Sequence, residues 1–403
     1  MQTIVQIKNF VKTIKEEINE PKRKKVFVQN KIWTDYNPLI SVVIPSFNYG
    51  KYIREAIDSV LNQTFSNFEI IIVDSSTDLK SINVLKQTNH DKISVFFRKG
   101  KHLVGDNRNY GIAKAKGKYI CCLDADDKIK NTYLEKALYL LETEHLDIVS
   151  TSLKMFGQDN RTFYQISNPN IKQMLEANHI FTVAVFKKSL WEKANGYYDF
   201  SREKNYIYED WDFWVRCIAL GARVENIIEP LMLYRIHDHS LSNNPNILNM
   251  SEQSRIIREH NKKLLTKKNI DNSLKINSYK YIVKNSLINL ENKKYRESKI
   301  LFAIPYTILG GADKVFLQLL STFEKLNLSP SVFTTELIPN TSKNTIEEYE
   351  KITSKIYDLP QFIKSQDDWL KFILFFLKTR NVKYIYLTNS HYFYKILPDI
   401  KKA

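Results

Sequence analysis

Between residues 40 and 153, short apolar runs alternate with stretches of helical periodicity. The apolar runs have the length of β-strands, and the stretches between them repeat apolar residues at helical spacing. Such alternation predicts an α/β fold with a mainly parallel, Rossmann-like sheet flanked by helices, whose binding loops follow the strands at one edge. The predicted strands are 40–44, 69–73, 93–97, 119–123 and 147–153, and the predicted helices are 52–61, 81–87, 107–115 and 131–145.

The N-terminal extension, residues 1–38, is predicted to be helical. Ile4, Ile7 and Val11 recur at three- and four-residue steps, which predicts an apolar stripe on a helix that ends before Pro21. This stripe can pack on its own chain, enter a short coiled coil or lie on a membrane surface, and periodicity does not distinguish these.

The main α/β domain, residues 39–245, is followed by a segment rich in Lys and Asn. Residues 246–298 carry lysine doublets at 262–263, 267–268 and 293–294, and are predicted to form a basic helical connector. The charged face of this connector is either solvated or attracted to an anionic membrane surface.

Residues 299–403 repeat the α/β pattern on a smaller scale. A strand at 300–304 is followed by the turn Gly310-Gly311 and a helix over 312–325. Further strands are predicted near 332–335 and 384–387. This segment therefore predicts a partial second Rossmann-like unit.

Composition limits the class of protein. The 403 residues, 43% of them hydrophobic, suffice for more than one core. A formal net charge of +16 indicates an anionic partner, such as nucleic acid, a membrane face or a phosphorylated substrate. No nucleic-acid recognition module is recognisable, so nucleic acid is not expected as a partner. No strand is followed by Gly-x-Gly-x-x-Gly, which disfavours a dehydrogenase.

The cysteines and the apolar segments bear on localisation. Cys121, Cys122 and Cys217 do not form a disulfide framework, which favours a reducing compartment. No segment approaches the ~18 unbroken apolar residues of a membrane helix, and charged residues interrupt the N-terminus where a signal peptide would need an apolar core. We therefore expect a cytoplasmic protein, with peripheral binding at the inner face of the plasma membrane as an option.

Three carboxylates follow the predicted strand 119–123 directly. Asp124, Asp126 and Asp127 stand within four positions, and such close like charges are costly unless a cation or positive side chains neutralise them. Carboxylate oxygens suit Mg2+ and Mn2+, which often bind through few protein carboxylates and the phosphates of a substrate. The alternative is an ordinary Asp-rich surface turn.

Two earlier strand ends suit a nucleotide pocket. Pro45 and Phe47 follow the first strand and Asp74 follows the second, where a flat surface and an acceptor for base and ribose would lie. An Asp in this place is also an ordinary turn former.

Acidic residues and a histidine complete the candidate chemistry. Glu209 and Asp210 begin a predicted helix, where acidic side chains act either as helix caps or as a catalytic base. His237 follows an apolar strand and is either a metal ligand or a structural histidine.

The main domain resembles the family 2 glycosyltransferases, which have the GT-A fold. The resemblance rests on the order, spacing and residue types of several short motifs, among them Asp124-Ala125-Asp126-Asp127 and Asn107-Arg108-Asn109-Tyr110-Gly111. The matching segments are 42–48, 59–64, 70–74, 107–112, 115–120 and 124–127.

The resemblance implies roles on the donor side. Pro45, Phe47 and Asp74 would line the base pocket, Arg108 would approach the nucleotide, and Asp124 would contact the ribose or the metal. A UDP-sugar is the expected donor, although the family commonly has two acidic residues where this chain has Asp74 followed by a serine.

The resemblance also implies a metal site and a base. Asp126 would contact both nucleotide and a divalent Mn2+ or Mg2+ ion, with Asp127 close by and His237 as a further ligand. Asp210, beside Glu209, would deprotonate the acceptor hydroxyl. The implied activity is sugar transfer from a nucleotide-diphosphate sugar to a carbohydrate or lipid-linked acceptor, with inversion, in bacterial surface polysaccharide or glycoconjugate synthesis.

A different class of function remains open. The chain could be a catalytically silent nucleotide-sugar-binding or scaffold protein, although the presence of both Asp126 and Asp210 favours an enzyme. The segment from Lys299 to Lys314 resembles the start of the GT-B fold family 4 glycosyltransferases. Because the donor-binding half of such an enzyme is not found in the chain, we expect no second activity from it.

Overall fold

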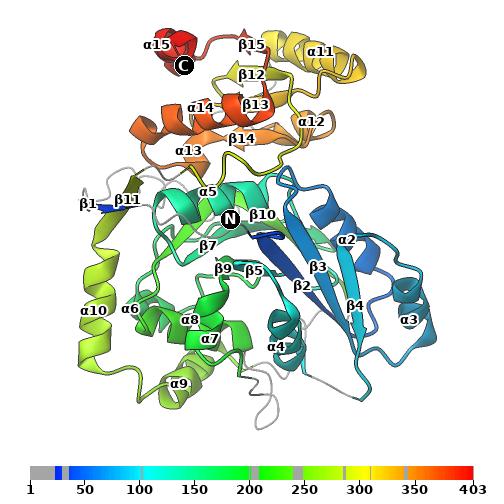
Figure 1. Ribbon diagram of the computed structural model, residues 1–403, viewed down its shortest axis with the longest axis vertical. Helices are drawn as coiled ribbons and strands as arrows, with labels where there is room; N and C mark the ends of the chain where they lie inside the picture. The colour runs from blue at the N-terminus through cyan, green and yellow to red at the C-terminus, as the bar shows by residue number, and fades with distance from the viewer. Residues whose placement is uncertain are drawn as a thin grey trace. The chain divides into compact units, whose positions relative to one another are not determined.

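The computed structural model describes residues 23–29, 36–100, 103–198, 200, 208–238, 248–284, 287–308, 310–339 and 344–402 (Figure 1). The chain divides into two compact units. The first contains most residues up to Ser286, and the second contains Leu287–Ala403 with the short segments Gln63–Ser66 and Lys130–Lys136. The helix predicted before Pro21 lies outside the described residues. The domain boundaries drawn from the sequence stay a prediction.

A nine-stranded sheet forms the centre of the first unit. Its order is β4-β3-β2-β5-β9-β7-β10-β6, with β8 beside β7. Strands β2, β3, β4, β5, β7 and β10 run in one direction, and β6, β8 and β9 run against them. The bounds are β2 Ile40–Ser46, β3 Phe68–Asp74, β4 Ile93–Phe97, β5 Tyr119–Cys122, β6 Lys128–Ile129, β7 Ile148–Gly157, β8 Thr162–Phe163, β9 Val185–Lys187 and β10 Val224–Ile236.

This sheet confirms the predicted α/β fold with a mainly parallel sheet. Strand β2 is buried along its whole length, as its uninterrupted apolar sequence requires. The short strand β9 was not predicted. It lies antiparallel between β5 and β7, so the two predicted strands are not neighbours. Three residues are too few to show a strand periodicity.

Helices α2 and α4 contact strands of this sheet, whereas α10 packs on α6 and α8. Helix α4 lies especially close to β2, because a Cβ atom on its Gly111 would be only 2.5 Å from Cγ1 of Val43. The bounds are α2 Ile53–Leu61, α3 Leu79–Lys86, α4 Val104–Lys114, α5 Tyr133–Thr143, α6 Ile171–Met174, α7 Lys188–Lys193, α8 Glu209–Ala219, α9 Met250–His260 and α10 Lys267–Asn277.

The region predicted as a basic helical connector is only partly helical. After α9 and α10 the chain forms strand β11, Tyr279–Lys284, which pairs in parallel with β1, Lys24–Gln29. A strand therefore stands at 279–284, where a helical connector was predicted, and β1 follows the N-terminal helix that was predicted to end before Pro21. Both are rich in aromatic and β-branched residues, which favour strands, but their partners lie far apart in the sequence.

The second unit contains a four-stranded parallel sheet in the order β14-β13-β12-β15, as expected for a partial Rossmann-like unit. The resemblance of this unit to family 4 glycosyltransferases stays a prediction. The strand bounds are β12 Ile300–Ile304, β13 Ser331–Thr334, β14 Ile356–Asp358 and β15 Tyr384–Leu387. The helix bounds are α11 Gly311–Lys325, α12 Ile346–Glu350, α13 Leu359–Phe362, α14 Trp369–Arg380 and α15 His391–Lys402.

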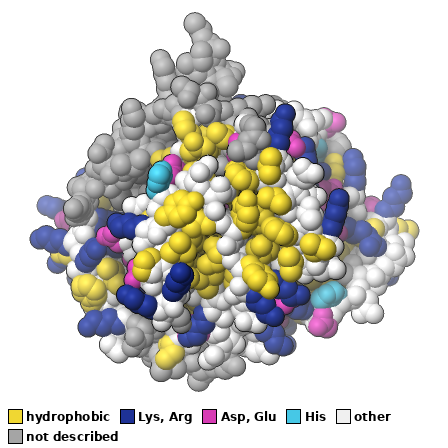
Figure 2. Space-filling model, turned by 90° about the horizontal axis from the view of Figure 1, so that it is seen from above, with side chains coloured by type: hydrophobic (Ala, Val, Ile, Leu, Met, Phe, Trp, Pro, Cys, Tyr) yellow, Lys and Arg dark blue, Asp and Glu magenta, His cyan; other side chains and the backbone are white. Residues whose placement is uncertain are grey.

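Exposed apolar side chains mark the surface of the second unit. Val315 on α11, Tyr384 on β15 and Tyr394 on α15 are each at least half exposed. Figure 2 shows hydrophobic side chains gathered on one face, bordered by Lys and Arg. Among the residues that the structure describes, no helix is both long and apolar enough to cross a membrane.

Candidate functional site

The carboxylate run lies where the sequence predicted it, directly after the buried strand β5. The amide of Leu123 donates to the carbonyl of Val43, which extends the pairing with β2 up to the first acid. The Oδ1 atom of Asp124 then accepts a hydrogen bond of 2.6 Å from Nη2 of Arg108. The central strands therefore present this turn at the edge of the sheet where parallel α/β folds bind ligands.

Arg108 on α4 joins two parts of the site. Its guanidinium pairs with Asp124 through one nitrogen and with Glu209, at the start of α8, through the other. The Arg108 side chain is only 3% exposed. Burial alone would lower the pKa of Arg108, but Asp124 and other neighbours raise it above its ordinary value, so the group stays charged. Arg108 thereby fixes the position of α8 relative to the carboxylate turn.

Asp126 and His237 face each other across the turn. Nε2 of His237, at the end of β10, lies 3.0 Å from Oδ2 of Asp126. The imidazole is held against the ring of Tyr52, with 5.0 Å between the ring centroids. Burial, and next the charge of Asp124, raise the pKa of Asp126 above its ordinary value, against a lowering effect of His237. The structure thus brings together the two residues that were predicted as metal ligands on different segments.

Asp127 has a different environment from Asp126. Its Oδ1 accepts a 2.8 Å hydrogen bond from the backbone amide of Arg235, while its buried Oδ2 has no hydrogen-bond partner. Burial and the neighbouring acids raise the pKa of Asp127 well above its ordinary value. Nε of Arg235 also donates to the carbonyl of Asp126 at 2.8 Å. Arg235 therefore ties β10 to the carboxylate turn, and the metal role of Asp127 stays a prediction.

The predicted base pocket lies at the ends of β2 and β3. Pro45 is buried in β2, and the ring of Phe47 just beyond is 40% exposed. Asp74 is buried, and its carboxylate accepts hydrogen bonds from the hydroxyl of Ser76 at 2.6 Å and from the Ser76 amide at 3.3 Å. Asp74 therefore shapes its own loop, and Phe47 offers the accessible flat surface.

Asp210 is buried beside Glu209 but has different partners. Its carboxylate accepts hydrogen bonds from Oγ1 of Thr182 at 3.0 Å, from Nδ2 of Asn178 at 3.4 Å and from the amide of Trp211 at 2.8 Å. Burial raises the pKa of Asp210, while Arg108 and these hydrogen bonds oppose that rise. A carboxylate with a raised pKa is a better proton acceptor than an exposed one.

Sequence reasoning missed residues that hold the site in place. Thr182 and Asn178 come from a loop between α6 and β9 with no sequence pattern. Asn109, next to Arg108 in a motif, could have been found. Its Oδ1 accepts from Nε1 of Trp191 and from the amide of Tyr197, and its Nδ2 donates to the carbonyl of Tyr197, all at 2.8 Å. Asn109 thus holds the backbone at Tyr197 against α4 and Trp191.

The site offers few protein ligands to a metal ion. Across the described ranges, no three or more His, Cys, Asp or Glu side chains are grouped so as to hold one. Asp126 and His237 are a pair, and the free Oδ2 of Asp127 is turned into the protein. A hard cation here would need further oxygens from water or from a substrate.

Comparison with known proteins gives consistent matches. Residues 41–205 match the model of the family described as glycosyl transferase family 2. An uncharacterized glycosyltransferase of Methanocaldococcus jannaschii is 33% identical over 49% of this chain and 71% of its own length. The O-antigen biosynthesis glycosyltransferase WbnJ of Escherichia coli is 30% identical over 50% of this chain and 81% of its own. An uncharacterized glycosyltransferase of Haemophilus influenzae is 29% identical, over 72% and 92% respectively.

The contacts of Asn109 lead to a testable prediction. We expect Asn109→Ala to lower the free energy of unfolding by about 2 to 3 kcal/mol, since three hydrogen bonds are lost and the Trp191 N–H is left without an acceptor. Urea denaturation followed by tryptophan fluorescence would measure this loss. Asn83→Ala, at an exposed asparagine on α3, is the control and should change little. Equal stability of the two variants would contradict the bracing role.

Proposed function

Since this chain belongs to the family 2 glycosyltransferases, we propose that it transfers a sugar from a nucleotide-diphosphate sugar to an acceptor hydroxyl with inversion. One observation carries the proposal. The buried guanidinium of Arg108 binds Asp124 on the candidate donor side and Glu209 beside the candidate base Asp210. One side chain therefore holds the donor side and the acceptor side of the candidate site next to each other.

The donor is proposed to bind across the ends of β2 and β3. The exposed ring of Phe47 suits a nucleotide base, and the carboxylate of Asp124 is partly exposed and within reach of a ribose. A UDP-sugar is our proposed donor. The single acid at this loop, Asp74, is already engaged by Ser76, so base recognition would use neighbouring backbone groups as well.

A divalent ion, Mn2+ or Mg2+, fits the residues present. Asp126 and His237 would hold it, and burial, followed by the charges of the neighbouring carboxylates, raises the pKa values of Asp126 and Asp127. Because Asp126 and His237 are only two ligands, the ion would take its further oxygen ligands from water and from the diphosphate. When bound, such an ion stabilises charge on the leaving diphosphate as a Lewis acid.

Asp210 is proposed as the general base. It is held by Thr182 and Asn178, so its carboxylate has a fixed direction. Asp210 would accept the acceptor's proton while the hydroxyl oxygen attacks the anomeric carbon, which inverts that carbon in a single displacement. A carbohydrate or lipid-linked acceptor is proposed. The relationship to WbnJ supports a role in surface polysaccharide synthesis.

Donor binding tests the metal assignment. In the intact protein, calorimetric titration with UDP should give binding that strengthens when Mn2+ is added. Asp126→Asn should lose most of this strengthening, because one charged ligand becomes neutral. Asp91→Asn, at a side chain that is 85% exposed, is the matched control. Mn2+ dependence that is unchanged in Asp126→Asn would remove Asp126 from the site.

Transfer assays test the base and separate an enzyme from a silent binder. Asp210→Asn should keep donor binding and lower the transfer rate by about 100- to 10,000-fold. Because the base must be deprotonated, activity should fall as the pH drops through the raised pKa of Asp210, above the range of an ordinary aspartate.

Thr182 allows a sharper form of this pH test. Its hydrogen bond lowers the pKa of Asp210, so Thr182→Ala should move the acidic limb of kcat/KM to higher pH. Thr182→Ser keeps the hydroxyl and should keep the limb in place. Identical pH profiles for wild type, Thr182→Ala and Thr182→Ser would assign the base elsewhere.

We also propose that the protein meets an anionic membrane surface on the cytoplasmic side. Lys267 and Lys268 are exposed in the first turn of α10, where positive charge does not stabilise a helix. The doublet therefore does not stabilise α10. We propose instead that it attracts anionic lipid.

Vesicle binding tests this proposal. Sedimentation with vesicles containing phosphatidylglycerol should weaken as salt is raised, and weaken further in Lys267→Glu/Lys268→Glu. The control doublet is Lys401→Glu/Lys402→Glu on α15, which makes the same charge change on exposed residues. Binding that is absent, or equally reduced in both variants, would contradict a role for α10.

A further inference from the structure

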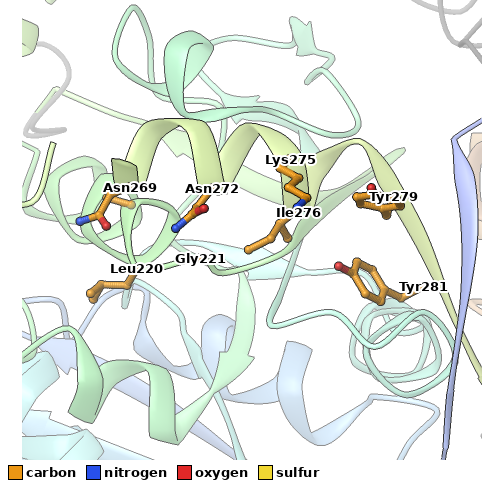
Figure 3. Close-up of a pocket in the computed structure, with 9 residues that line it drawn as sticks. Leu220, Gly221, Asn269, Asn272, Lys275, Ile276, Tyr279 and Tyr281 are labelled. Carbon is orange, nitrogen blue, oxygen red and sulfur yellow. The ribbon is translucent and has the colours of Figure 1, made fainter. Parts of the chain in front are cut away.

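The first unit contains a second cavity, of about 410 Å³, at the opposite end of α8 from Asp210. It lies between the turn that ends α8, one face of α10 and strand β11 (Figure 3). Asp210 and Leu220 are ten residues apart along this helix, which corresponds to about 15 Å. The cavity is therefore separate from the candidate transfer site, and its size is within the usual range for small-ligand pockets.

The local structure explains why this space stays open. Asn272 and Ile276 lie one helical turn apart on α10, so they share one face of the helix. Tyr279 and Tyr281 are two residues apart on β11, so they share one face of the strand. Gly221 forms part of the wall with φ of +89°, and a Cβ atom there would lie 3.3 Å from Cδ1 of Ile276. A larger residue at this position would be strained and would narrow the cavity.

Most of the polar side chains at the cavity are free to bind a ligand. Throughout the described part of the chain, no hydrogen bond is formed by the amide of Asn272, the ammonium of Lys275 or the hydroxyls of Tyr279 and Tyr281, whereas Nδ2 of Asn269 donates to the carbonyl of Leu264 at 2.9 Å. Figure 3 shows these side chains around one space, with the apolar side chains of Leu220 and Ile276 beside them. The cavity thus combines aromatic rings, an apolar patch and several free donors and acceptors.

The composition of the lining narrows the class of ligand. No carboxylate, histidine or cysteine is among the lining residues, so the cavity does not have the side chains that usually bind a metal ion. A sugar ring presents apolar C–H faces that pack on aromatic rings and hydroxyls that bond with amide, phenol and ammonium groups. Lys275 would add attraction for a carboxylate on an acidic sugar.

We propose that this cavity binds a sugar residue of a glycan, separately from the transfer site. The choice of a sugar rests in part on membership of a glycosyltransferase family, but not on the catalytic roles proposed for Asp126 or Asp210. A glycan held here would stay at a high effective concentration near the enzyme between transfer events.

Saturation-transfer NMR on the intact protein tests the proposal with two probes, N-acetylglucosamine and glucuronic acid. Asn272→Ala/Lys275→Ala changes two exposed side chains of α10 and should weaken binding of at least one probe by about tenfold, through the loss of its polar contacts. Tyr279→Phe, which removes only a hydroxyl, should weaken it to a smaller extent. Lys86→Ala removes an exposed lysine of α3 that is outside the lining; it is the control and should bind as the wild type does.

Several outcomes would overturn the proposal. These are the absence of a signal from both sugars, a signal that survives in Asn272→Ala/Lys275→Ala, or a Lys275-dependent response to inorganic phosphate without any response to sugar. UDP binding is measured on the same variants. It should be unchanged, so a failure of the cavity proposal is distinguishable from a failure of the proposed transferase function.

Discussion

The buried guanidinium of Arg108 is the constraint on which the candidate site depends. A buried charge is stable only when it is paired, and removing one partner of a buried pair typically costs about 3 to 5 kcal/mol. Here the partners come from the turn after β5 and from the first turn of α8. Both elements must therefore stay in register with α4, which keeps the carboxylates of the site at fixed positions even without a ligand.

Packing around α4 makes this arrangement possible. Gly111 lets the helix approach β2 and β3 so closely that Arg108, one turn earlier, reaches the carboxylate turn. Asn109, on the same helix, holds the backbone of Tyr197. On the other side, Arg235 binds the same turn from the end of β10. The acidic turn is thus held by α4 and by β10, and its conformation does not depend on local sequence alone.

Features encoded locally could be predicted from the sequence. The buried strands β2, β3 and β5, and the acids at their ends, follow from uninterrupted apolar runs and their polar boundaries. The pairing of β11 with β1 and the insertion of β9 depend on contacts between distant segments, which periodicity does not report. Glu209 and Asp210 are neighbours in the sequence and were therefore treated as a pair. In the structure Glu209 binds Arg108 and Asp210 binds Thr182, and the sequence pattern does not report these contacts between distant segments.

Charge compensation divides the acids of the site into two groups. The single positive charge of Arg108 is shared by the carboxylates of Asp124 and Glu209, and burial of the guanidinium strengthens both ion pairs. Asp126 faces the imidazole of His237, and Asp127 accepts from the backbone amide of Arg235, while burial raises the pKa values of both acids. Asp127 is almost fully buried, whereas Asp126 lies at the turn beside His237. A cation arriving with a diphosphate would relieve this imbalance, so we infer that the residual negative charge after Arg108 is what selects a metal-bound donor.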